Sequence, residues 1–159
     1  MTLSAKLLCE LNARVGQANQ SFVVYDGPRC VRCAFDQCDR LAVTLAELQL
    51  ETTELATTTV AQLQAASQEL STRVNYLLEP VAPIETDAQG CIVQMRSSPP
   101  QKDDNGRRYY ELTLRRGGAV ALCRYEKPTA GPRQRVAAVL TQEVVGRLID
   151  DFGAVVDGI

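Results

Sequence analysis

The chain of 159 residues contains no histidine and no tryptophan. Without an imidazole, neither a Ser-His-Asp nor a Cys-His catalytic arrangement can form, and a metal site must use other ligands. No phosphate-binding glycine loop, dinucleotide-binding turn or nucleophile elbow is present either. The sequence therefore predicts a protein that is not an enzyme and that carries no cofactor, unless the cysteines bind zinc.

Strong net charge and long apolar segments are also absent. The net charge is -2, and the shares of hydrophobic residues (45%) and charged residues (23%) are typical of a globular chain. No apolar run approaches the roughly 20 residues of a membrane span, and Glu10, Asn12 and Arg14 interrupt the first apolar stretch. We therefore expect a cytoplasmic protein without a membrane partner, in which the six cysteines stay reduced.

The hydrophobic pattern predicts an α+β fold in two parts. Residues 1–78 form a helical part, with a short helix at 3–15, a strand-like run at 22–25, a cysteine-rich loop, and helical sequence from about 36 to 78. The Thr-rich sites near 52 and 57–59 either interrupt this helix or lie within it, and we favour a long helix from about residue 54. Residues 79–159 predict a four- or five-stranded antiparallel meander that a C-terminal amphipathic helix covers, with Thr141 as its N-cap.

The dipeptide Gly117–Gly118 predicts a two-residue hairpin turn in this meander. In the register that such a turn sets, Arg116 pairs with Ala119, and Glu111 pairs with Arg124 on the outward face. The other face of both strands is then apolar. We therefore expect Arg124 to point away from the core.

The spacing Cys30-x2-Cys33-x4-Cys38 is the sharpest local motif. Three thiolates on a loop could bind a tetrahedral Zn²⁺, with Cys9 as a possible fourth ligand. The Cys-x-x-Cys pair also fits a redox site, and cysteine is equally common as a small buried hydrophobic residue. Buried structural thiols are the favoured interpretation, and a zinc site is the first alternative.

In the predicted helical region a leucine recurs every seven residues, except for one step of eight residues between Leu55 and Leu63. Such a narrow stripe is typical of a coiled-coil seam. A helix at 3–15 is only about 20 Å long, too short to cover the whole stripe. We therefore expect the chain to associate with itself, as a homodimer or a larger assembly, through Leu41, Leu48, Leu55, Leu63, Leu70 and Leu77.

The hairpin region is basic, with nine Lys or Arg against four acidic residues between positions 102 and 135. Arginines beside an aromatic side chain on one sheet face could hold phosphates and stack a base. The sequence therefore predicts, as an alternative, a nucleic-acid site made of Arg107, Tyr109, Arg115 and Arg124.

These patterns favour a non-catalytic, self-associating scaffold or adaptor whose strand-rich part docks a protein partner. The first alternative is a nucleic-acid-associated protein that uses the basic hairpin face. The second is a small Cys-ligated zinc protein or thiol-redox protein.

Overall fold

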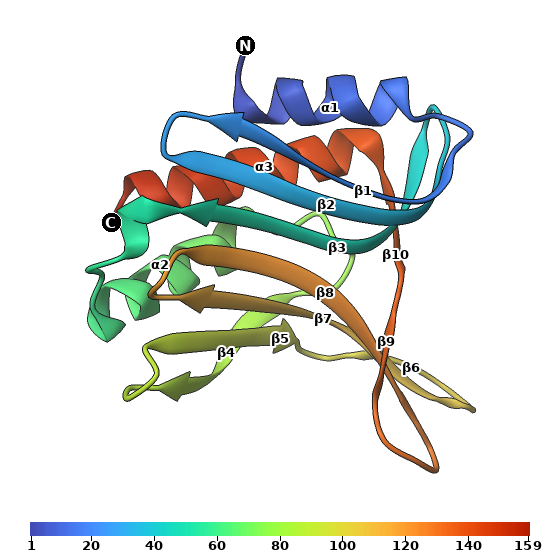
Figure 1. Ribbon diagram of the computed structural model, residues 1–159. Coiled ribbons are helices and arrows are strands. Elements are labelled where there is room, and N and C mark those ends of the chain that lie inside the picture. Colours follow the sequence, from blue (N-terminus) through green and yellow to red (C-terminus); the bar gives the residue numbers. More distant parts are fainter.

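The computed structural model describes all 159 residues, and most of its regular structure is β-strand. Strands contain 46% of the residues and helices 28%. Ten strands form one antiparallel sheet; in the view of Figure 1 the N-terminal helix lies along its upper edge, and the other α-helices lie behind the strands. The predicted α+β fold, with a helical N-terminal half and a four- or five-stranded meander, is therefore wrong.

The helices alternate with two groups of strands. The helices are α1 (Leu3–Ala13), α2 (Val60–Arg73) and α3 (Gln142–Asp157). A short 3₁₀ helix, η1 (Thr53–Leu55), precedes α2. The first group of strands comprises β1 (Ala18–Asp26), β2 (Arg29–Cys38) and β3 (Ala42–Thr52). The second group comprises β4 (Val81–Asp87), β5 (Ile92–Ser97), β6 (Gln101–Asp103), β7 (Gly106–Arg115), β8 (Ala119–Pro128), β9 (Gln134–Val136) and β10 (Ala138–Thr141).

A single sheet joins the two groups in the order β1-β2-β3-β8-β7-β5-β4. One edge of β3 is shared, because residues 48–51 pair with β8 and residues 42–45 pair with β10. The sheet thus runs across the boundary at residue 78 that separated the two predicted parts. The two groups of strands bury their apolar side chains in a common core.

Residues 36–52 are strand where a helix was predicted. The apolar residues of β3 alternate as Val43 and Leu45, then as Leu48 and Leu50, all facing the helices. Ala46 has no partner on β2, so a bulge shifts the alternation by one residue at this point. The bulge produces a three-residue step, which resembles helical spacing in the sequence.

The leucine stripe is buried within one chain. Five of its six members are at most 4% exposed, and only Leu41 is open to solvent, at 78%. The stripe runs through β3, η1, α2 and the segment after α2, so it forms no coiled coil. Its burial removes the reason for expecting self-association, which stays a prediction without this support. The five buried members are Leu48, Leu55, Leu63, Leu70 and Leu77.

Threonine N-caps begin α2 and α3. The Thr59 side chain accepts from the backbone N–H of Gln62, whose own side chain accepts from the Thr59 N–H. The Thr-rich segment therefore starts a helix and does not interrupt one. The N-cap predicted at Thr141 is confirmed, because its hydroxyl accepts from Val144 N at 3.1 Å.

The predicted hairpin exists, but its register differs by one residue. Arg115 pairs with Ala119, so the turn has three residues rather than two. Arg124 consequently lies opposite Tyr110, whereas the prediction placed it opposite Glu111. A shift of one residue moves each side chain of a strand to the other face. Arg124 therefore lies on the face that carries the helices.

The end of β3 accounts for this longer turn. The backbone N–H of Thr52 donates to the carbonyl of Gly118 at 2.7 Å. Gly118 has φ +104°, and a Cβ there would clash with the carbonyl oxygen of Thr52. The turn is thus held against a strand from the other half of the chain, which the local sequence does not reveal.

The three helices divide one face of the sheet. Helix α1 packs on β1, β2 and α3, while α2 covers β4, β5 and β7. Helix α3 lies between them and contacts β3 and β10. None of the three has both the length and the apolar character that a membrane crossing requires.

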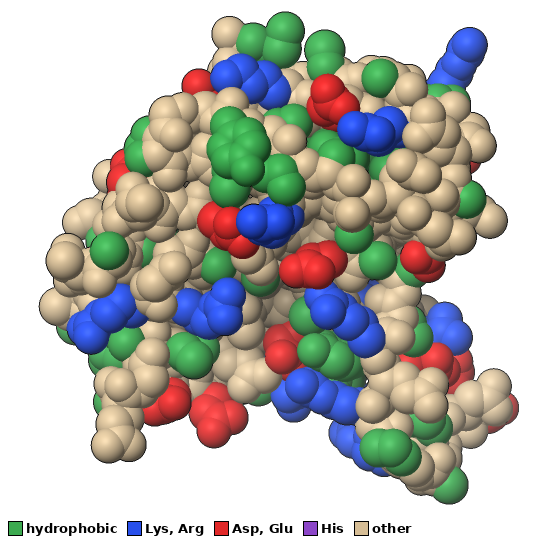
Figure 2. All heavy atoms as spheres, in the orientation of Figure 1, with side chains coloured by type: hydrophobic (Ala, Val, Ile, Leu, Met, Phe, Trp, Pro, Cys, Tyr) green, Lys and Arg blue, Asp and Glu red, His purple; other side chains and the backbone are tan.

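The opposite face of the sheet is open to solvent. Figure 2 shows Lys and Arg side chains interspersed with Asp and Glu side chains on this face. Cross-strand ion pairs account for part of this pattern, such as Arg32 with Glu51 at 2.7 Å and Arg96 with Glu111 at 3.3 Å. These charges keep the uncovered face polar.

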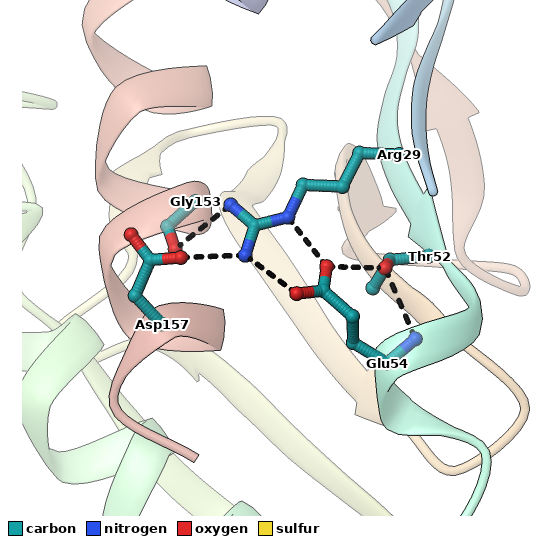
Figure 3. A network of polar contacts seen from close by, with 5 residues as sticks. All are labelled: Arg29, Thr52, Glu54, Gly153 and Asp157. Carbon is teal, nitrogen blue, oxygen red and sulfur yellow. Dashed lines mark hydrogen bonds and ion pairs between the residues drawn. The ribbon is translucent and has the colours of Figure 1, made fainter. Parts of the chain in front are cut away.

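Arg29 connects the sheet to the C-terminal end of α3 (Figure 3). Its guanidinium donates to both carboxylate oxygens of Glu54, at 2.6 and 3.1 Å, and forms an ion pair with Asp157. Thr52 donates its hydroxyl to Glu54 at 2.7 Å. Hydrogen bonds from Arg29 are the main reason why the pKa of Glu54 lies below its ordinary value.

We expect the substitution Arg29→Met to lower the free energy of unfolding by about 1 kcal/mol at pH 7, since solvent screens these partly exposed pairs. A lowered carboxylate pKa stabilises the fold above the ordinary pKa, here 4.5, and this contribution disappears as the pH falls through the lowered value. The difference between the two proteins in urea unfolding should therefore shrink between pH 5 and pH 3. Arg40→Met, at an exposed arginine in a turn, serves as the control. A difference that is constant with pH would contradict this assignment.

Candidate binding cleft

The cysteines of the predicted zinc site lie on strand β2 rather than on a loop. Residues three apart in a strand point to opposite faces, so Cys33 is buried under the helices while Cys30 faces the open side. Cys38 is buried at the end of the strand, and Cys9 is exposed on α1. No group of three or more His, Cys, Asp or Glu side chains could hold a metal ion. The structure therefore does not bring the four predicted ligands together.

The thiols of β2 are also poorly suited to redox chemistry. Burial raises the pKa of Cys33 to about 12, and it raises the pKa of Cys30 and of Cys38. A reactive thiol needs a lowered pKa, because the thiolate is the nucleophile. These pKa directions favour the interpretation of Cys33 and Cys38 as structural thiols.

The predicted nucleic-acid residues lie on two faces of the sheet. Arg107, Tyr109 and Arg115 alternate along β7 and belong to the open face, whereas Arg124 is 8% exposed on the covered face. Arg107 and Arg115 are eight residues apart, roughly 26 Å along a strand. The four residues therefore do not form one surface.

A cleft with a volume of about 560 Å³ lies around Arg124. Helix α2 ends at Arg73, and the segment between α2 and β4 continues over this end of the sheet. The strand residues Tyr110 and Arg124 form one side of the cleft, and the segments at 77–80 and 99–101 form others. We call it the Arg124 cleft. Its lining is Leu77, Leu78, Glu79, Pro80, Pro99, Pro100, Gln101, Arg108, Tyr110, Arg124, Ala137 and Val139.

A buried ion pair lies in this cleft. Nη2 of Arg124 is 3.0 Å from Oε2 of Glu79, and the two side chains are 9% and 13% exposed. The same nitrogen donates to the side-chain oxygen of Gln101 at 3.0 Å. The guanidinium also lies over the ring of Tyr110, 4.3 Å from its centroid. These contacts stabilise a charged side chain on the covered face of the sheet, at a position where the alternation of β8 would otherwise place an apolar side chain.

The ion pair is not completely satisfied. Nη1 of Arg124 and Oε1 of Glu79 are buried but make no hydrogen bond within the protein. Leaving such a group without a partner costs about 1–3 kcal/mol. The ion pair that lines the cleft therefore keeps one donor and one acceptor without a partner, both closed off from solvent in this conformation.

Two exposed aliphatic side chains border the cleft. Leu78 is 97% exposed and Val139 is 70% exposed. Leu78 has φ +64°, in the left-handed region that favours glycine. A non-glycine residue there is less stable by about 1 kcal/mol or more. An exposed leucine in an unfavourable backbone conformation contributes no packing that would explain its presence.

Sequence reasoning singled out Arg124 but not its partners. The segment Leu77-Leu78-Glu79-Pro80 follows a helix, and its first leucine is buried while its second is not. A proline just after an apolar pair indicated only the end of the helix. No local pattern connects Glu79 with Arg124, which lies 45 residues further along the chain.

Comparisons with known proteins give no family for this chain. No family model matches it, and neither the curated proteins nor the solved structures contain a match. The function must therefore be inferred from the geometry of the molecule.

We expect Arg124→Met to lower the free energy of unfolding by about 3 kcal/mol, because it leaves the Glu79 carboxylate buried without a cation. The double substitution Arg124→Met/Glu79→Gln should lose less than the sum of the two single substitutions. Urea unfolding of the four proteins in a double-mutant cycle measures this coupling. Additive losses would show that the pair makes no contribution as a pair.

Proposed function

We propose that this protein is a non-catalytic protein-interaction module, and that the Arg124 cleft binds an extended segment of a partner protein. The observation that carries the proposal is the incompletely satisfied Arg124–Glu79 pair beside two exposed aliphatic side chains. Two features support it: a peptide backbone matches the donor and the acceptor that lack a partner, and the border of the cleft is apolar.

The free polar atoms match the backbone of a peptide. A peptide group has one N–H donor and one C=O acceptor. Once the side chains of the cleft shift enough to expose these two buried atoms, which lack a partner, the carbonyl can accept from Nη1 of Arg124, and the N–H of the same or a neighbouring residue can donate to Oε1 of Glu79. An extended segment exposes its backbone groups, whereas a helix satisfies them internally. A segment of extended chain is therefore the occupant that fits.

The border of the cleft favours apolar side chains on this segment. Leu78 and Val139 are two of the six large hydrophobic side chains that are exposed on the whole protein, and both line this cleft. Pro80, Pro99 and Pro100 add apolar surface. Side chains of this kind around a small number of buried polar groups are typical of binding pockets.

The proposal keeps the adaptor function inferred from the sequence but replaces its basis. Five of the six leucines that suggested an assembly of identical chains are buried within the fold, so they are unavailable to a second copy. The occupant proposed here is a segment of a different protein, recognised by the cleft.

A phage-displayed library of random 12-residue peptides provides the test. We expect the protein to select peptides that contain aliphatic residues, and Leu78→Asp to weaken their binding at least tenfold. The matched control is Tyr25→Asp on β1, which also places a charge at an exposed hydrophobic position and should leave binding unchanged. If no peptide is selected, or if both variants lose binding equally, the proposal is wrong. If instead Leu78→Asp converts a dimer into a monomer in sedimentation, the occupant is a second copy and the proposed partner is wrong.

Leu78→Gly separates the binding role of this residue from a structural one. Glycine adopts a positive φ without strain, although it also increases the entropy of the unfolded chain. We expect the free energy of unfolding to stay constant or to rise by up to about 1 kcal/mol, while binding of the selected peptides weakens at least tenfold. Urea unfolding and fluorescence anisotropy measure the two quantities. A clear loss of stability would show that Leu78 supports the fold.

A further inference from the structure

A second cleft, on the open face of the sheet, is lined by four cationic side chains. Arg96 comes from β5, Arg107 from β7, Lys127 from β8, and Arg133 from the loop between β8 and β9. The cleft has a volume of about 450 Å³, and Ser97, Pro100 and Tyr109 complete its lining. Figure 2 shows Lys and Arg side chains gathered over this part of the sheet, where β6 and β9 lie in Figure 1. We call it the Arg107 cleft.

One carboxylate faces these four cations. Oε2 of Glu111 accepts from Arg133 at 2.8 Å and from Arg96 at 3.3 Å, and its side chain is 5% exposed. Lys127 donates its ammonium only to the carbonyl oxygens of Pro128 and Gly131. The cleft therefore has three uncompensated positive charges, in a chain whose net charge is -2.

Arg107 and Lys127, the two cations of the cleft that do not pair with Glu111, are not neutralised elsewhere on the protein. No ion pair of the protein includes Arg107 or Lys127. Nε of Arg96 is buried and makes no hydrogen bond within the protein. Like charges held together without a counter-charge repel one another, and an anion relieves this repulsion.

The geometry favours a compact anion with several oxygen atoms. Guanidinium groups bind phosphate oxygens through paired N–H donors, and lysine binds them as a point charge. A monocarboxylate would balance only one of the three excess charges. A phosphate with two or more negative charges matches both the charge of the cleft and its donors.

The aromatic residues of the cleft argue against the stacking of a nucleic-acid base. Arg96 lies over the ring of Tyr109 at 4.7 Å, and Arg133 lies over the ring of Tyr125 at 3.9 Å. The two rings stack on each other with centroids 5.9 Å apart. Because guanidinium groups and the partner ring already contact these faces, a base has no free ring to stack on.

From these observations we infer that the Arg107 cleft binds a phosphate group that carries at least two negative charges, such as a phosphomonoester or a pyrophosphate. The phosphate lies among Arg107, Lys127 and Arg133, next to Arg96. Most of this site is on the opposite face of the sheet from the Arg124 cleft, and Pro100 is the one lining residue that the two share, so the inference does not depend on the proposed peptide binding.

Isothermal titration of the full chain with sodium pyrophosphate, at about 50 mM salt to limit screening, tests the site. We expect submillimolar binding that Arg107→Gln/Lys127→Gln weakens at least tenfold. Arg40→Gln/Arg115→Gln removes the same charge outside the cleft and should leave the affinity within twofold. Leu78→Asp should also bind pyrophosphate normally, which separates this site from the Arg124 cleft. Thermal unfolding should show that each variant is folded.

Two results would overturn the inference. The first is the absence of pyrophosphate binding, or equal binding by the protein and the Arg107→Gln/Lys127→Gln variant. The second is that a 12-nucleotide single-stranded DNA binds more tightly than pyrophosphate and that Arg115→Gln also weakens the binding of this DNA. The second result would show an extended nucleic-acid surface along β7 in place of a compact phosphate site.

Discussion

The register of the hairpin between β7 and β8 is the constraint on which both clefts depend. Strand β8 pairs with β3 on one side and with β7 on the other, so its register decides which side chains face the helices. With Arg115 opposite Ala119, Val120, Leu122 and Arg124 lie on the covered face. Tyr109 and Tyr125 then meet on the open face. A two-residue turn would have exchanged the faces of one strand, and neither cleft would exist.

The covered face changes in character along β8 because the helices do not extend over all of it. Where α2 and α3 cover the sheet, the core is formed by apolar side chains, most of them leucine and valine. Beyond the end of α2 at Arg73, a loop replaces the helix, and a charged pair lies where an apolar contact would be more stable. A buried ion pair gives little net stability compared with apolar residues of the same size. Its position at the edge of the core, with unpaired atoms beside exposed aliphatic side chains, is more consistent with recognition than with stability.

Local signals in the sequence identified some elements and failed for others in ways that have physical causes. The N-cap at Thr141 and the presence of a hairpin at 117–118, though not its register, were predicted because their residues act over a few positions. The strands at 29–52 were mistaken for loop and helix because bulges at Asp36 and Ala46 interrupt the alternation that marks a strand. The cysteines then appeared to form a loop motif, although a strand directs Cys30 and Cys33 to opposite faces. The pairing of Glu79 with Arg124 and of Arg133 with Glu111 depends on tertiary contacts, so no local pattern could predict either cleft.

Neighbouring residues of one hairpin line the two clefts for which we propose binding, because a strand alternates its faces. Tyr110 and Arg124 point into the Arg124 cleft, while Tyr109 and Lys127 line or border the Arg107 cleft. Pro100, in the segment between β5 and β6, lines both. The arginines differ in role because of their surroundings: Arg124 has a carboxylate of its own and is buried with it, whereas Arg96 and Arg133 share one oxygen of Glu111. The first arrangement leaves hydrogen-bonding capacity that suits the proposed peptide, and the second leaves the excess positive charge from which we infer a phosphate site.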